Sequence, residues 1–142
     1  MNTKAEKFKA YIDKVDPKAF MVDEIKDDER HFVAFRSGIE VKGQRLPFLV
    51  LIDDSIYVML RIFVATQVVN DGNKAAIYDF INQGNKEYKV FKFYTSDNGD
   101  IVLDICLPAS DDAFDPQLVD AMIRQVAYPY LNDNLTSILE KV

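Results

Sequence analysis

The stretch from Lys89 to Val119, KVFKFYTSDNGDIVLDICLPASDDAFDPQLV, contains the sharpest structural signal in the chain. It reads as two short strands around a polar turn, an apolar exit that ends in a proline, and a helix start at Asp115-Pro116. Successive side chains of a strand point to opposite faces, so each of the two strands has one apolar face. The length of the turn decides whether these two faces match.

Two turn lengths fit the segment 97–100. A two-residue Asn98-Gly99 turn would put the apolar residues of the two strands on opposite faces of the hairpin. A three-residue loop, 97–99, pairs Lys92 with Asp104 and brings the apolar residues together on the other face. A slip of one residue moves every side chain to the other face, so the hydrophobic pattern selects the register. We therefore predict the three-residue loop, with Gly99 in the left-handed conformation that this loop requires.

Composition sets the broad class. The chain has 142 residues, 49% of them hydrophobic, which predicts one domain over residues 1–142 with a core that needs no disulfide or metal. The single cysteine excludes an intrachain disulfide framework. No apolar segment follows Met1, and the longest apolar run, 48–52, is too short to span a bilayer. We expect a cytoplasmic protein that does not act at a membrane.

The net charge of −6 is concentrated in the last third of the chain. Residues 97–142 carry nine acidic residues and two basic ones, a net of −7, and residues 1–96 carry 15 basic and 14 acidic residues, a net of +1. Binding to phosphate backbones needs a basic surface. An acidic C-terminal third therefore argues against nucleic acid as the partner.

Helical and strand patterns alternate along the chain. A helical stripe, 5–15, ends at Asp16-Pro17, and a second helix with inward Ile77, Phe80 and Ile81 follows the polar loop 70–73. We predict that Gly84 ends this second helix. Strands are predicted over 31–41, 45–52 and 56–65, with a possible bulge at Gly38, and 20–25 is either a short strand or a connecting arm. Strand alternation places most of the phenylalanines in the core, namely Phe32, Phe35, Phe48, Phe63, Phe91 and Phe93.

Pro129 divides the C-terminal apolar pattern into two stripes. An interior proline removes a backbone hydrogen bond and clashes with the preceding turn, so we predict a kink or two helices there. The second stripe consists of Leu131, Leu135, Ile138, Leu139 and Val142, and the bend is expected to turn part of it away from the core.

The sequence predicts no catalytic, cofactor-binding or metal-binding residue. His31 is the only histidine, and no partner for it is visible in the sequence. Cys106 is expected to share a face with Asp104, which would raise the pKa of the thiol and disfavour a nucleophile. The acidic pairs at 53–54, at 111–112 and in the 97–100 turn match no spaced metal motif and read as turn or cap residues.

The order of elements resembles the YbjN-like family of bacterial sensory transduction regulators, whose layout is shared with the type III secretion chaperone-like fold. The residues that carry the resemblance are 91–94, 98–103, Leu107-Pro108 and 114–119. The resemblance implies an α+β fold: a helix, a three-stranded antiparallel meander, a helix, a β-hairpin and a kinked C-terminal helix. It also implies a module that is often dimeric and has no catalytic residues or cofactor.

We therefore expect a non-enzymatic regulator or chaperone-like adaptor that binds a protein partner and forms a homodimer. The alternative is a small-ligand binder or an enzyme that uses aspartates and tyrosines of the C-terminal third. The expected contact surface is the uncovered sheet face or the segment after Pro129, because exposed apolar patches mark interfaces. Its candidate residues are Val90, Tyr94, Val102, Leu131, Leu135, Ile138 and Leu139.

Overall fold

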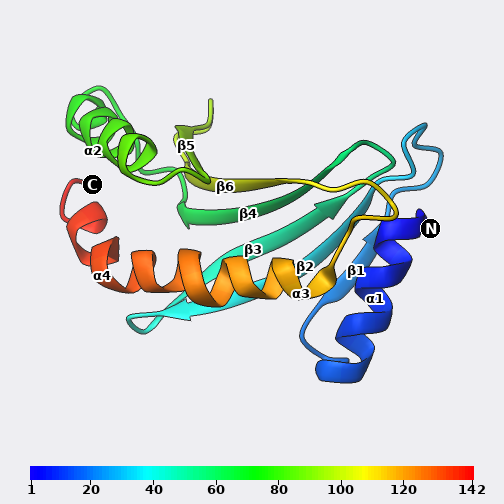
Figure 1. The fold of residues 1–142 in the computed structure, drawn as a ribbon. Helices are drawn as coiled ribbons and strands as arrows, with labels where there is room; N and C mark the ends of the chain where they lie inside the picture. The colour runs from blue at the N-terminus through cyan, green and yellow to red at the C-terminus, as the bar shows by residue number, and fades with distance from the viewer.

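The computed structural model describes residues 1–142 and shows an α+β fold (Figure 1). Six antiparallel strands form one sheet in the order β1-β2-β3-β4-β6-β5. The elements are, in chain order, α1 (Thr3–Val15), β1 (Met21–Glu24), β2 (Val33–Val41), β3 (Gln44–Ile52), β4 (Tyr57–Ala65), α2 (Lys74–Glu87), β5 (Phe91–Thr95), β6 (Ile101–Pro108), α3 (Pro116–Ala121), the π-helical turn η1 (Met122–Ala127) and α4 (Tyr128–Leu139). The predicted fold class is thus confirmed, and the 20–25 segment forms an edge strand.

All helices lie on one face of the sheet. Phe8 of α1 packs edge-on against Phe35 of β2, with ring centroids 4.9 Å apart. On the other side of the molecule, Tyr130 of α4 lies 5.0 Å from Phe91 of β5, and α2 approaches the same strand through Gly84. The long α3–η1–α4 helix crosses between these two contacts (Figure 1). The core is therefore a single layer between the helices and one sheet face.

The hairpin has the predicted register. Lys92 pairs with Asp104 and Phe93 pairs with Leu103. Gly99 has a φ of +84°, and its N–H donates to the Ser96 carbonyl at 2.9 Å, which closes the three-residue loop. The apolar faces of the two strands match in this register, as predicted, and a two-residue Asn-Gly turn does not form.

Gly84 does not end its helix, contrary to the prediction. It lies buried inside α2, which continues to Glu87. A Cβ at this position would meet the Phe93 ring at 3.1 Å and the Tyr130 hydroxyl at 3.3 Å. The glycine allows α2 to lie close to β5 and α4, so its role is packing. Gly38 likewise pairs regularly with Pro47, and the only shift of register in the sheet lies between Phe63 and Ala65.

Pro129 disturbs the last helix without ending it. The chain runs continuously from α3 through η1 into α4, and the Tyr128 N–H donates to the Ile123 carbonyl, five residues back. This wider turn ends at Ala127, two residues before Pro129, whose ring would clash with the carbonyl four residues back in a regular α-helix. The disturbance expected at this proline thus takes the form of a π-helical turn.

The second apolar stripe remains in the core, so the prediction that Pro129 turns it outward is wrong. Leu131, Leu135 and Ile138 are 0%, 1% and 2% exposed. Because the helix does not bend away, these side chains pack within the chain itself and are not available as a contact surface. Only the end of the stripe is exposed, Leu139 at 38% and Val142 at 49%.

Lys4 anchors α1 to the sheet. Its side chain is completely buried, and its Nζ donates to the backbone carbonyls of Ser55, Tyr57 and Ala109. Three acceptors satisfy the three donors of an ammonium group, which makes the burial of this charge tolerable. The contact fixes α1 against the β3–β4 turn and the end of β6.

Candidate functional site

The sheet face opposite the helices, hereafter the open face, has no element over it. The strand register defines three rows of side chains on this face. One row is Leu51–Met59–Cys106, the next is Leu49–Arg61–Asp104–Lys92, and the third is Phe63–Val102–Tyr94. A charged row thus lies between two apolar rows.

Most apolar side chains on the open face are half-buried although nothing covers them. Leu51, Met59 and Cys106 line a shallow hollow of about 360 Å³ at one end of this face. Val102 is 1% exposed between Phe63 and Tyr94 on the neighbouring strands. Apolar surface of this kind, bordered by polar groups, is typical of contact sites.

An ion pair occupies the centre of the open face. The Nε and Nη2 atoms of Arg61 donate to the two carboxylate oxygens of Asp104, both at 2.9 Å. The Asp104 side chain is 1% exposed and the Arg61 side chain 30% exposed. The Arg61 guanidinium also lies 5.9 Å from the centre of the Tyr94 ring, and Nη2 approaches the Met59 sulfur at 3.4 Å. This two-pronged geometry fixes the guanidinium against the face.

The titratable groups beside this pair are held in their protonated forms. Burial, and then the neighbouring Asp104 carboxylate, raises the pKa of the Cys106 thiol and of the Tyr94 hydroxyl above their ordinary values. Hydrogen bonding to Asp104 raises the pKa of Arg61. A thiol with a raised pKa is a weak nucleophile. The arrangement is therefore suited to contact with another surface rather than to acid–base or nucleophilic chemistry.

The open face combines two predicted residues with several that were not predicted. Tyr94 and Val102 lie on it, but Val90 precedes β5 and packs against the core. Phe63, assigned to the core from the sequence, is half-buried on the open face because β4 places Leu60, Ile62 and Val64 inward. The strict alternation of 57–65 is the signal that could have identified Met59, Arg61 and Phe63.

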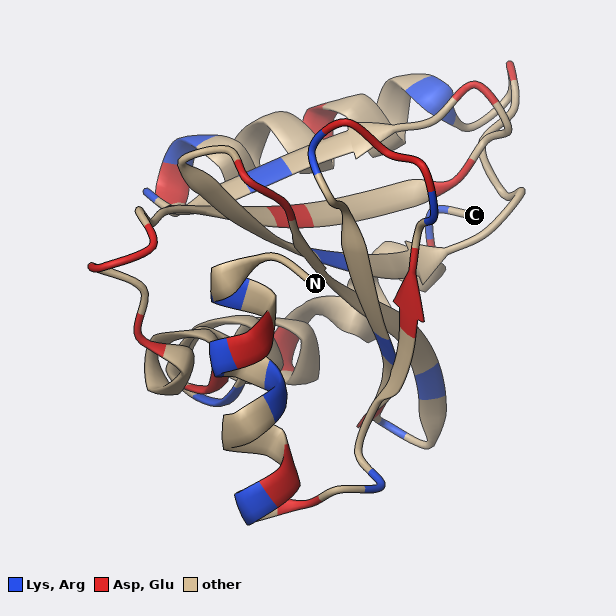
Figure 2. Cartoon of the chain, turned by 90° about the vertical axis from the view of Figure 1, so that its right-hand side faces the viewer, with Lys and Arg blue, Asp and Glu red and all other residues tan.

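Charged residues are found mainly on the helices and in the connections, and the strands carry few of them (Figure 2). The central pair of the open face therefore stands out on a largely uncharged sheet. Its two members come from segments 43 residues apart, Arg61 in β4 and Asp104 in β6. Only the assembled sheet brings them together.

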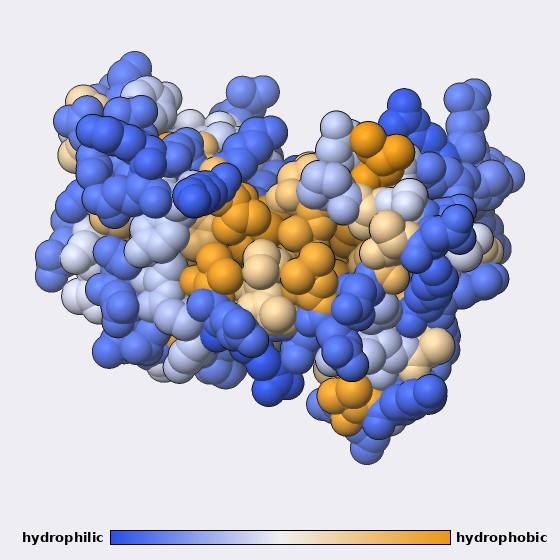
Figure 3. All heavy atoms as spheres, in the orientation of Figure 1, coloured by the Kyte–Doolittle hydropathy of each residue, from blue (hydrophilic) through white to orange (hydrophobic).

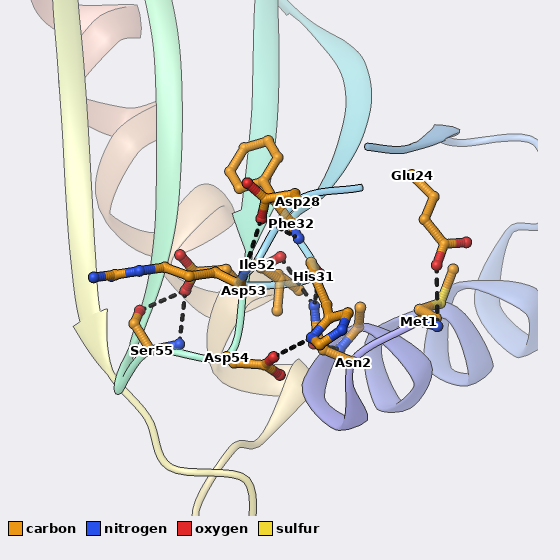
Figure 4. A network of polar contacts seen from close by, with 12 residues as sticks. Met1, Asn2, Glu24, Asp28, His31, Phe32, Ile52, Asp53, Asp54 and Ser55 are labelled. Atoms are coloured by element: carbon orange, nitrogen blue, oxygen red, sulfur yellow. Dashed lines mark hydrogen bonds and ion pairs between the residues drawn. The ribbon is translucent and has the colours of Figure 1, made fainter. Parts of the chain in front are cut away.

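His31 has a partner, contrary to the expectation from the sequence. Its Nδ1 lies 2.5 Å from the Asp54 carboxylate, which joins the β1–β2 connection to the β3–β4 turn (Figure 4). The Asn2 side chain donates to the His31 carbonyl at 2.7 Å and to the Ile52 carbonyl at 3.1 Å. The neighbouring Asp53 accepts from the backbone N–H and hydroxyl of Ser55. These contacts tie the N-terminus to two turns and account for the aspartates structurally.

A second apolar area lies on the helical side of the molecule. Figure 3 shows apolar atoms gathered in a hollow in the middle of this side, with hydrophilic residues around it. The long helix carries Leu118, which is 45% exposed, and the half-buried Met122 and Val126. The ion pair beside Leu118, Asp120–Arg124, is exposed to solvent, whereas Asp104 of the open face is buried.

The fold and the open face together define an α+β protein with one uncovered face of its sheet. The family model of YbjN, described as "putative bacterial sensory transduction regulator", matches residues 20–128. The chain belongs to the YbjN family, as the resemblance of its hairpin and following helix indicated. The match extends from just before β1 to the first residue of α4. No curated protein matches the chain significantly.

None of the helices combines the length and the apolar character needed to cross a membrane.

Proposed function

We propose that this YbjN-family chain is a non-enzymatic protein-interaction module, a regulator or chaperone-like adaptor, and that it dimerises through the open face. The observation that carries the proposal is the uncovered face itself, with two half-buried apolar rows on either side of the Arg61–Asp104 pair. Two-fold dimers are the most common way to bury such a surface. The same face is the proposed site for a protein partner.

The open face is preferred over the C-terminal segment for a physical reason. Leu131, Leu135 and Ile138 already fill the chain's own core, so a contact there would require the long helix to detach. On the open face, Leu51, Met59 and Tyr94 can be covered without any rearrangement. Leu139 remains a peripheral candidate at the end of α4.

The non-enzymatic role is supported by the state of the polar groups. Arg61 and Asp104 satisfy each other, and the raised pKa values of Cys106 and Tyr94 keep both groups protonated at neutral pH. We expect one domain over residues 1–142 in the cytoplasm, with neither a cofactor nor nucleic acid or a membrane as partner. The acidic C-terminal third supports the exclusion of nucleic acid.

Sedimentation equilibrium at micromolar concentration tests the dimer. The wild-type chain should have twice the monomer mass of 16.3 kDa, and Met59→Asp should have the monomer mass. An aspartate at position 59 would lie beside the Arg61 guanidinium, so the monomer should still fold. Ile56→Asp is the matched control, because Ile56 is 60% exposed in the β3–β4 turn and outside the three rows. A wild-type mass of 16.3 kDa would rule out the dimer.

Affinity capture from the cells of origin tests the adaptor role. Proteins that bind the wild-type chain and Ile56→Asp, but not Met59→Asp, would be partners of the open face. If all three chains capture the same proteins, the open face is not the binding site.

A further inference from the structure

A small cavity lies between α1 and η1, on the helical side and away from the open face. It encloses about 110 Å³. Its wall is mainly apolar and includes Phe8 and Ile12 of α1, Phe20 of the arm before β1, and Ile123 of η1. Tyr11, Asp16, Asp120 and Arg124 add polar atoms to the wall. The cavity thus joins an apolar interior to a charged rim.

The charges at the rim do not cancel. The Nε of Arg124 donates to Asp120 at 2.9 Å, which leaves this guanidinium already paired. The Asp16 carboxylate accepts only from the backbone N–H of Lys18, at 3.1 Å, and has no cationic partner. Burial, and then the Asp120 carboxylate, raises the pKa of Tyr11, so its hydroxyl remains a neutral donor. A cationic or neutral polar group is favoured at this rim, and an anion is not.

The π-helical turn contributes directly to the wall. Ile123 and Arg124 line the cavity and lie in η1, where the backbone hydrogen bond spans five residues instead of four. Such turns are rare and frequently occur at functional sites. Because Pro129 cannot donate a hydrogen bond, the sequence itself favours the wide turn beside the cavity. The backbone of this wide turn therefore sets the shape of the η1 side of the cavity.

The size of the cavity limits what it can hold. A dry apolar cavity of roughly 150 Å³ binds benzene, and pockets for drug-sized ligands begin at about 300 Å³. A cavity of about 110 Å³ with an open side has room for one ring or one branched aliphatic group. We propose that it binds a small amphiphile, with a single apolar group inside and an amine or hydroxyl at the rim near Asp16 and Tyr11.

Three phenyl compounds that differ in their polar group provide the test: 2-phenylethylamine, 2-phenylethanol and phenylacetate. Each is titrated into the uniformly ¹⁵N-labelled full chain, up to about 10 mM, which covers the affinity expected of a one-ring ligand. The amine and the alcohol should shift the amide signals of Tyr11, Phe20 and Ile123 in a saturable way. Phenylacetate should bind roughly threefold more weakly or worse, because it meets the Asp16 carboxylate.

Two variants separate the cavity from its rim. Ala19→Leu places a larger side chain in the cavity wall and should weaken binding of the amine roughly tenfold, and Ala10→Leu, exposed on α1, should leave it unchanged. Asp16→Asn replaces an exposed side chain and should remove most of the preference for the amine over phenylacetate. Absence of saturable shifts, shifts confined to other residues, or equal binding by Ala19→Leu would each overturn the proposal. If Ala19→Leu does not fold, the outcome with Asp16→Asn decides.

Discussion

The Asn85 side chain holds Phe93 at the outer edge of the sheet. Its Oδ1 accepts from the Phe93 backbone N–H at 2.6 Å, and its Nδ2 donates to the Phe93 carbonyl at 3.1 Å. Because β5 is the last strand of the sheet, these groups would otherwise face solvent or another chain. An amide side chain from α2 thus takes the place of a neighbouring strand.

Asn85→Ala should destabilise the fold by about 1–2 kcal/mol, because it removes both hydrogen bonds from Phe93. It should also increase self-association, since the edge of β5 becomes available for pairing. Urea denaturation and light scattering over time measure the two effects. Asn82→Ala, an exposed position in the same helix, is the control and should show neither. Unchanged stability in Asn85→Ala would mean that water replaces the amide without cost.

Gly84→Ala should destabilise the protein despite the higher helix propensity of alanine. Alanine is favoured over glycine by about 1 kcal/mol inside a helix. The new methyl group, however, would lie 3.1 Å from the Phe93 ring. That ring is held by Tyr130 and Phe91, with centroids 5.7 Å and 6.0 Å away, and has little room to move. Overpacking of about 1–3 kcal/mol should therefore exceed the gain. A raised melting temperature would show that the ring gives way.

The hairpin and Gly84 show what the sequence can and cannot reveal. The register of the hairpin depends on residues within one local segment, and matching its apolar faces was sufficient to predict Lys92 opposite Asp104. The role of Gly84 depends on Phe93 and Tyr130, which reach it only in the folded chain. A helix-ending glycine and a close-packing glycine look alike in sequence.

The candidate site was predicted in part for the same reason. Tyr94 and Val102 were placed on the open face by local alternation in the hairpin. Arg61 belongs to a different segment, and its pairing with Asp104 required the order in which β4 and β6 lie side by side. The stripe after Pro129 was misjudged because a π-helical turn absorbs the proline and keeps the helix on the core.

Gly99→Ala should cost more stability than Gly43→Ala. Both glycines have positive φ, +84° and +76°, so both variants incur the left-handed strain of about 1 kcal/mol. A Cβ at Gly99 would also lie 2.9 Å from the Val69 carbonyl oxygen, but a Cβ at Gly43 would meet nothing within 4 Å. The difference in the free energy of unfolding between the two variants, measured by chemical denaturation, gives the cost of the crowding at Gly99. Equal losses would show that the loop before α2 moves aside.

Removing one partner of the Arg61–Asp104 pair should destabilise the fold far more than replacing both partners. Arg61→Leu leaves a buried carboxylate without its partner, and a loss of about 3 kcal/mol is expected. Changing both residues to leucine removes the charges together and should cost much less. A double-mutant cycle measured by urea denaturation gives the coupling. Additive losses would show that Lys92, opposite Asp104, already compensates the carboxylate.

Tyr130 should make the protein sensitive to alkaline pH. Burial, which outweighs the effects of Tyr88 and Glu87, raises the pKa of its hydroxyl from the ordinary tyrosine value of 10.0 to about 12. The folded chain then holds this proton more tightly than the unfolded chain. The resulting stability is fully present below pH 10 and is lost as the pH rises toward 12. Tyr130→Phe removes the titrating group, so its stability should fall less steeply between these pH values. Tyr78→Phe is the control for removal of a tyrosine hydroxyl, because Tyr78 is 49% exposed in α2. Denaturant midpoints at several pH values measure how steeply stability falls in each chain. If the stability of Tyr130→Phe falls as steeply as that of the wild type, other groups cause the alkaline loss.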